Sequence, residues 1–187
     1  MNSVESVIES LKRDYNYIID IDEGENSPIE IEFDRLENSR IVLSDKVKER
    51  FKNISLTTIV DKKEIGFFAY GMEYLDNQVV LNEVMVSDGL LKSDVTEFGP
   101  IITEQLKRKI NSVIDEREVV CFGHSHPNIS EEYNYFSLGD LVGVRNLTLK
   151  NNEFKNKDMQ LIACLISNDY KFIYYNPDDD KFYRIEM

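Results

Sequence analysis

The sequence holds few of the residues that bind metals, form disulfides or mark a membrane protein. Its 187 residues include two histidines, two cysteines and no tryptophan. No stretch approaches about 18 consecutive apolar residues, the length that a membrane-spanning helix needs. The segment from Met1 to Tyr17 also lacks the basic start and apolar run of a secretory signal. We therefore expect a cytoplasmic protein with no membrane partner.

Basic residues are also scarce. The chain has 22 Lys and Arg against 35 Asp and Glu, a formal net charge of -13. Nucleic-acid binding needs clustered cations that neutralise phosphates, so this balance argues against a nucleic-acid partner. An acidic surface suits a basic protein partner, but it also serves solubility alone. The composition leaves both open and gives no indication of the oligomeric state.

The two cysteines lie in apolar, strand-like runs. Cys121 follows two valines, and Cys164 lies within Leu-Ile-Ala-Cys-Leu-Ile. Buried free thiols are the expectation for cysteines in such runs. Cys121 is three residues before His124, so on a strand it points to the opposite face from that histidine. It is therefore a poor candidate for a metal ligand.

Apolar periodicity predicts one globular domain that mixes strands and helices. Strands are expected at residues 17–21, 29–33, 40–43, 64–71, 78–86, 118–122, 160–167, 170–175 and 181–185. Helices are expected at residues 4–15, 46–51, 100–114 and 137–149, and β-branched residues at 54–60 leave the end of the second one open. This order predicts an α+β fold, an α/β sandwich with a central mixed sheet flanked by helices. Residues 1–38 are expected to be an N-terminal extension packed on the core, and residues 39–187 the main domain.

The run Gly123-His124-Ser125-His126-Pro127 carries the clearest chemical signal. It ends a predicted strand, and residues two apart on a strand point to the same face, so the two histidines lie side by side. Two adjacent imidazoles form half of a tetrahedral zinc site, although an ordinary surface pair has the same pattern. The chain has no other histidine, so a further ligand must be a carboxylate or a thiolate. Asp140 is the nearest strong candidate.

The segment Ser137-Leu138-Gly139-Asp140 opens the next predicted helix. A hydroxyl followed three residues later by an acid is a helix-capping pattern. The capping role and a ligand role for Asp140 are compatible, because the first turn of a helix is a rigid place from which to hold a metal ligand.

Taken together, these residues resemble the JAMM motif of MPN (JAB) domain metalloproteases, in particular prokaryotic JAB-type isopeptidases of deubiquitinase-like activity. The resemblance covers roughly Arg40 to Tyr175. It implies a cytidine-deaminase-like sandwich fold that holds Zn2+. It also implies a hydrolase that cleaves the amide bond at the C-terminus of a ubiquitin-like protein, in a conjugate or in an unprocessed tail.

The same resemblance implies roles for five residues. The zinc ligands would be His124, His126 and Asp140, the residue that stabilises the tetrahedral intermediate would be Ser137, and the catalytic acid/base would be Glu64. In this mechanism Glu64 takes a proton from water activated by zinc and passes it to the leaving amine.

The chain departs from the family pattern at two places. The spacing from His126 to Ser137 is three residues longer than usual, so the loop at residues 128–136 carries an insertion. The first glycine after Glu64 comes one position early, at Gly66, although Gly71 stands where the second is expected. Glu83 is the alternative candidate for the acid/base role.

Two further alternatives stay open, and a third is disfavoured. The aromatic residues of the inserted loop, Tyr133, Tyr135 and Phe136, either cover a bound substrate tail or pack on the domain as a plug. The protein could be a catalytically inactive MPN scaffold for protein–protein interaction, although inactive members usually lose ligands. A purely structural zinc site is disfavoured, because such sites are usually closed by four ligands rich in cysteine.

Overall fold

The structure is a computed structural model that describes residues 33–74, 77–92, 117–127, 135–150 and 161–187, together with Glu9 and Arg108. The predicted helices at 4–15 and 100–114, and the predicted strands at 17–21 and 29–33, lie almost entirely outside these residues. Within the described ranges, we find no helix whose length and hydropathy would suit a membrane span.

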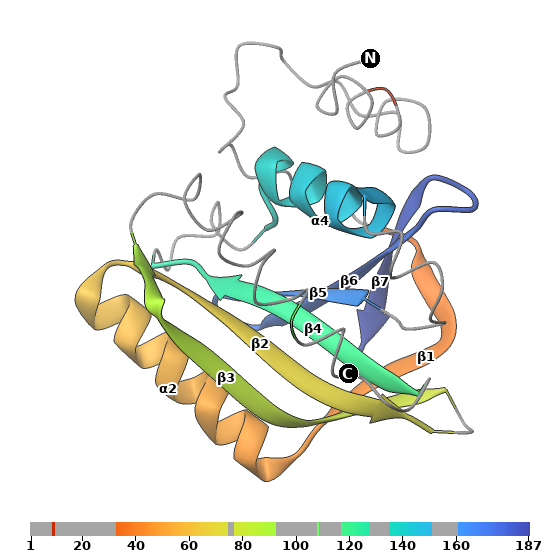
Figure 1. The fold of residues 1–187 in the computed structure, drawn as a ribbon. Helices are drawn as coiled ribbons and strands as arrows, with labels where there is room; N and C mark the ends of the chain where they lie inside the picture. The colour runs from red at the N-terminus through yellow and green to blue at the C-terminus, as the bar shows by residue number, and fades with distance from the viewer. Residues whose placement is uncertain are drawn as a thin grey trace.

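Seven strands and two helices have their bounds in the described residues (Figure 1). The strands are β1 Arg35–Leu43, β2 Glu64–Glu73, β3 Gln78–Lys92, β4 Glu118–Ser125, β5 Leu161–Ile166, β6 Tyr170–Asn176 and β7 Lys181–Glu186. The helices are α2 Asp45–Asp61 and α4 Leu138–Lys150. The strand β1 begins before the expected boundary between residues 38 and 39.

The strands form one closed barrel in the order β1-β3-β2-β4-β5-β6-β7. Three neighbouring pairs are parallel (β1 with β3, β4 with β5, β1 with β7) and the others are antiparallel. The predicted α+β sandwich with helices flanking an open sheet is therefore wrong. Apolar periodicity identifies strands and their buried faces, but it does not reveal that β1 and β7 pair and close the sheet.

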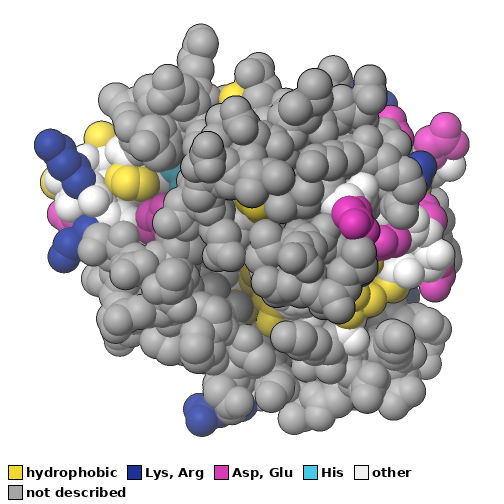
Figure 2. Space-filling view, turned by 90° about the horizontal axis from the view of Figure 1, so that it is seen from above, with side chains coloured by type: hydrophobic (Ala, Val, Ile, Leu, Met, Phe, Trp, Pro, Cys, Tyr) yellow, Lys and Arg dark blue, Asp and Glu magenta, His cyan; other side chains and the backbone are white. Residues whose placement is uncertain are grey.

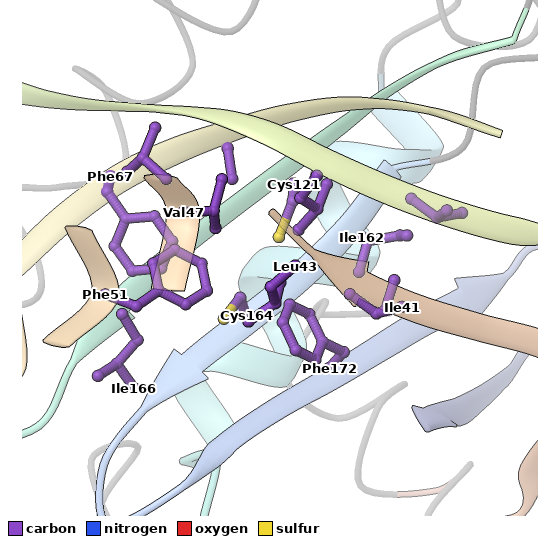
Figure 3. Close-up of a cluster of buried hydrophobic side chains, with 14 of the residues drawn as sticks. Ile41, Leu43, Val47, Phe51, Phe67, Cys121, Ile162, Cys164, Ile166 and Phe172 are labelled. Atoms are coloured by element: carbon purple, nitrogen blue, oxygen red, sulfur yellow. The ribbon is translucent and has the colours of Figure 1, made fainter. Parts of the chain in front are cut away.

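Side chains alternate between two apolar layers, because successive residues of a strand point to opposite faces. One layer receives residues from all seven strands and from α2, and Figure 3 shows part of it. The other layer joins α4 to β2 and to β4 through β7. In Figure 1, α2 and α4 lie on opposite sides of the β2–β4 region. The two helices therefore contact opposite faces of the same strands.

The helix α2 resolves the question that the β-branched run left open. Its N-cap Ser44 accepts a hydrogen bond from the Val47 amide at 3.3 Å, which confirms the predicted start. The helix then continues through the whole run, because Ile54 and Thr58 extend the buried face begun by Val47 and Phe51. Packing of that face on the barrel overrides the modest strand preference of the run.

Both cysteines are free and fully buried, as predicted. Figure 3 shows them in the layer that α2 contacts. Burial raises the pKa of the Cys164 thiol, and its hydrogen bond with Cys121 raises it further. Neither thiol belongs to the histidine face of β4.

Candidate metal centre

The end of β4 and the beginning of β2 bring three candidate residues together. The two strands are antiparallel, and His124 lies opposite Gly66, two residues after Glu64. The Nε2 atoms of His124 and His126 are 3.0 Å apart, and His126 Nε2 is 3.9 Å from Glu64 Oε1. One nitrogen or oxygen from each residue lies within 4.8 Å of the others, the spacing of a group that could hold a metal ion.

Glycine before the first histidine permits this approach of the strands. A Cβ atom on Gly123 would lie 2.4 Å from the carbonyl oxygen of Cys164 on β5 and 2.6 Å from the Phe67 ring on β2. Both distances are far below van der Waals contact, so any other residue would push β4 away from its neighbours. The position of the histidine pair thus depends on the absence of a side chain at Gly123.

The fourth candidate, Asp140, approaches from the first turn of α4. Its Oδ1 atom lies 3.4 Å from His124 Nε2. Its Oδ2 atom accepts hydrogen bonds from the amide and hydroxyl of Ser137, at 2.7 and 2.8 Å. One carboxylate oxygen therefore lies near His124, while the other is fixed within the helix start.

Ser137 caps α4 as the Ser-x-x-Asp pattern predicts. Its Oγ atom accepts a hydrogen bond from the Asp140 amide at 3.1 Å, and its own hydrogen is donated to Asp140 Oδ2. A hydroxyl has one hydrogen to donate. To donate it to an oxyanion, as the resemblance implies, Ser137 must release Asp140.

Glu64 has the electrostatic surroundings of a functional carboxyl group. Burial raises its pKa above the usual value, while His124 acts to lower it and Asp140 to raise it. Its Oε2 atom is buried and has no hydrogen-bond partner among the described residues. Leaving a buried acceptor unpaired costs about 1–3 kcal/mol. A buried polar group that departs from normal pairing and has a shifted pKa is a candidate for a functional group.

The donor set fits a zinc ion. Two histidine nitrogens facing each other at 3.0 Å, an unpaired carboxylate oxygen and a second carboxylate are the N and O ligands that Zn2+ prefers. Their side chains are between 7% and 15% exposed, so the group is enclosed but reachable. In Figure 2, which looks onto the side where α4 lies, a histidine in cyan is visible beside hydrophobic side chains.

Other candidates lie elsewhere. Glu83 is exposed and lies opposite Tyr70, four residues along β2 from the Gly66–His124 pair, about 13 Å at the usual strand rise. In the inserted loop, Phe136 is buried in the layer beneath α4, as the plug alternative predicts. The Tyr135 ring lies 5.6 Å from the Lys171 ammonium, and Tyr133 lies outside the described residues.

Two residues behind the histidine pair, Thr58 and Ser125, were not predicted from the sequence to belong to the site. Both are fully buried, and their hydroxyl oxygens are 2.5 Å apart. The available signal was the position of Thr58, four residues after Ile54, on a helix face that is otherwise apolar.

Comparison with known proteins gives no independent identification. No protein-family model matches the sequence, and no curated protein matches it.

Proposed function

We propose that this protein is a zinc-dependent isopeptidase or peptidase that hydrolyses the amide bond at the C-terminus of a ubiquitin-like modifier. The observation that carries this proposal is the convergence of Glu64, His124 and His126, with Asp140 Oδ1 3.4 Å from His124. The motif that joins these residues in the sequence resembles that of JAMM metalloproteases. We further propose that the protein acts in the cytoplasm.

In this proposal His124, His126 and Asp140 hold the zinc. Three protein ligands leave a position open, which distinguishes a catalytic zinc site from a structural one. When bound, zinc would polarise the scissile carbonyl and lower the pKa of water toward about 7.

Glu64 is then the general acid/base. Its pKa is raised toward neutral pH. A group that both accepts and returns a proton works best when its pKa is near the working pH. The unpaired Oε2 atom is available to accept that proton. Ser137 orients Asp140 in the resting enzyme through the two hydrogen bonds that it donates.

A substrate tail has a strand edge beside this group. Among the described strands, β1 pairs with β3 only over Gln78–Leu81, whereas β2 pairs with β3 as far as Lys92, which lies opposite Glu64. Beyond Leu81, the other edge of β3 therefore has no partner strand among the described residues, and it lies near the site. An extended peptide can add to such an edge, with main-chain hydrogen bonds giving affinity.

The test combines metal analysis with cleavage assays. We expect wild type to contain about one zinc per chain, His126→Ala to lose it, and Glu64→Gln to retain it. Glu64→Gln should lose cleavage of ubiquitin-like conjugates or tail-extended precursors, while Glu83→Gln, a matched change away from the site, should keep it. Wild type that stays free of metal after incubation with zinc would overturn the proposal. Full cleavage by Glu64→Gln would remove Glu64 from its role.

A further inference from the structure

The buried polar side chains of the described residues gather at one end of the barrel. They are Thr58, Ser125 and Ser137. Ser137 binds Asp140 on the α4 face, whereas the other two bind each other on the α2 face. Burying a hydroxyl is unfavourable unless it is hydrogen-bonded, so the grouping of all three beside the candidate metal ligands calls for a physical reason.

Ser125 lies between the two histidines and points to the opposite face of β4. Its Oγ atom lies 2.5 Å from Thr58 Oγ1, accepts a hydrogen bond from the Ile65 amide at 3.0 Å, and lies 3.5 Å from the Ile65 carbonyl oxygen. If Thr58 donates, Ser125 accepts two hydrogen bonds and donates its own hydrogen to Ile65. That arrangement uses every hydrogen-bonding position of the hydroxyl.

These bonds take over where the main-chain pairing of β4 with β2 stops. The last paired residues of the two strands are His124 and Gly66. On the other edge of β4, pairing with β5 continues to Ser125, and the His126 amide donates to the Ile166 carbonyl at 2.9 Å. The side chain of Ser125 thus replaces the missing ladder bond on the β2 edge. Its partner there, Ile65, directly follows Glu64.

Thr58 completes the connection from α2. The other residues on its buried face, Val47, Phe51 and Ile54, are apolar, and Thr58 reaches Ser125 from the last turn of the helix. A valine of nearly the same shape would fill the same space without the hydroxyl. The hydroxyl is therefore needed for its bond to Ser125 and not for filling the core.

We propose that Thr58 and Ser125 are positioning residues of the metal centre. Their hydroxyl pair fixes the end of β4 to α2 and to the start of β2, which sets the distance between the histidine pair and Glu64. This inference rests on the proposed metal function for its affinity readout, but the positions of the histidine rings can be measured without metal.

The test uses three variants of the full chain. Thr58→Val removes the hydroxyl and keeps the shape, Thr58→Ser keeps the hydroxyl, and Thr57→Val makes the same change at the exposed neighbouring residue. Zinc affinity is measured by competition with a chelator, and the absorption spectrum of bound Co2+ reports ligand geometry. Histidine ring NMR spectra of the metal-free protein contain only two imidazoles, one for each histidine of the chain.

We expect Thr58→Val to weaken zinc binding by about 10–100-fold, the usual effect of losing a partner behind the ligands, and to alter the Co2+ spectrum and both ring signals. Thr58→Ser and Thr57→Val should resemble wild type. Wild-type ring signals and zinc affinity in Thr58→Val would overturn the inference, even if its stability fell. If wild type itself binds no zinc, the metal function is refuted, but altered ring signals in Thr58→Val would still uphold the positioning role. If Thr58→Val does not fold, Thr58→Ala is measured against the same criteria.

Discussion

The two helices contribute to the candidate site in opposite ways. The helix α4 presents a charged group, Asp140, whose free oxygen faces His124 at 3.4 Å. The helix α2 presents no charge there, but its Thr58 hydroxyl contacts Ser125 behind the histidines. In our proposal, the α4 side of the sheet supplies a metal ligand, Asp140, and the α2 side holds the strand that carries the histidines in position. A short local motif marks the first, whereas the second joins residues 67 positions apart and leaves no motif.

The largest expected effect lies on the α4 side. Asp140→Asn keeps an oxygen that can accept the Ser137 hydrogen bonds but removes the charge, so we expect zinc affinity to fall by more than about 100-fold, beyond the loss typical of outer partners. Asp140→Ala should also lose about 1 kcal/mol of stability through the helix start. Chelator competition and urea unfolding measure the two effects. Unchanged zinc affinity in Asp140→Asn would instead indicate Glu64 as the third ligand.

The next largest effect is expected on β4, the strand that carries the histidines and lies between α2 and α4. Gly123→Ala introduces a Cβ atom 2.4 Å from the Cys164 carbonyl oxygen, which is backbone and cannot rotate away. We expect a loss of about 1–3 kcal/mol in the free energy of unfolding, the usual cost of overpacking, measured in urea. A variant as stable as wild type would show that β4 can move away from β5 at no cost.

The pH dependence of stability tests the burial of Glu64. Because burial raises its pKa in the folded protein, the folded state holds this proton more tightly than the unfolded chain does. The resulting stabilisation is complete below the ordinary carboxyl pKa and is lost as pH rises through the folded-state pKa. In metal-free protein, Glu64→Gln should therefore gain stability relative to wild type as the pH rises from below the ordinary carboxyl pKa to above the raised folded-state pKa of Glu64. Parallel pH profiles of the two proteins in urea unfolding would contradict this.

The smallest effect is expected at a glycine of α4. A Cβ atom on Gly143 would meet nothing within 4 Å, in contrast to Gly123. Alanine favours the helix by about 1 kcal/mol over glycine, so Gly143→Ala should stabilise the protein by up to that amount. Thermal unfolding measures the shift. A destabilised variant would show that this face of α4 is more closely packed than the described residues indicate.

Much of the local structure could be predicted because its causes are local. The Ser44 and Ser137 caps, the buried cysteines and the strand that carries the histidines all follow from residues within a few positions of each other. The prediction that Glu64 lies near the histidines came from the family resemblance, because the sequence alone does not show that β2 pairs with β4. The roles of these residues remain predictions.

The features of the fold and of the site that were not predicted depend on contacts between distant parts of the chain. The length of α2 is set by the barrel that it packs against, and the same contact buries Thr58 next to Ser125. The pairing of β1 with β7 turns the expected sandwich into a barrel. Propensity and periodicity act over a few residues, so neither could reveal these contacts.

The pairing of β1 with β7 also bears on how the chain reaches this structure. Arg40 pairs with Glu186, so this seam joins segments from opposite ends of the described sequence. Contacts between segments so far apart require a large loss of chain entropy before they stabilise anything, and proteins rich in them fold slowly. During synthesis β1 emerges long before its partner β7. We therefore expect the final closure of the barrel to be a late event in folding, after β7 has been synthesised.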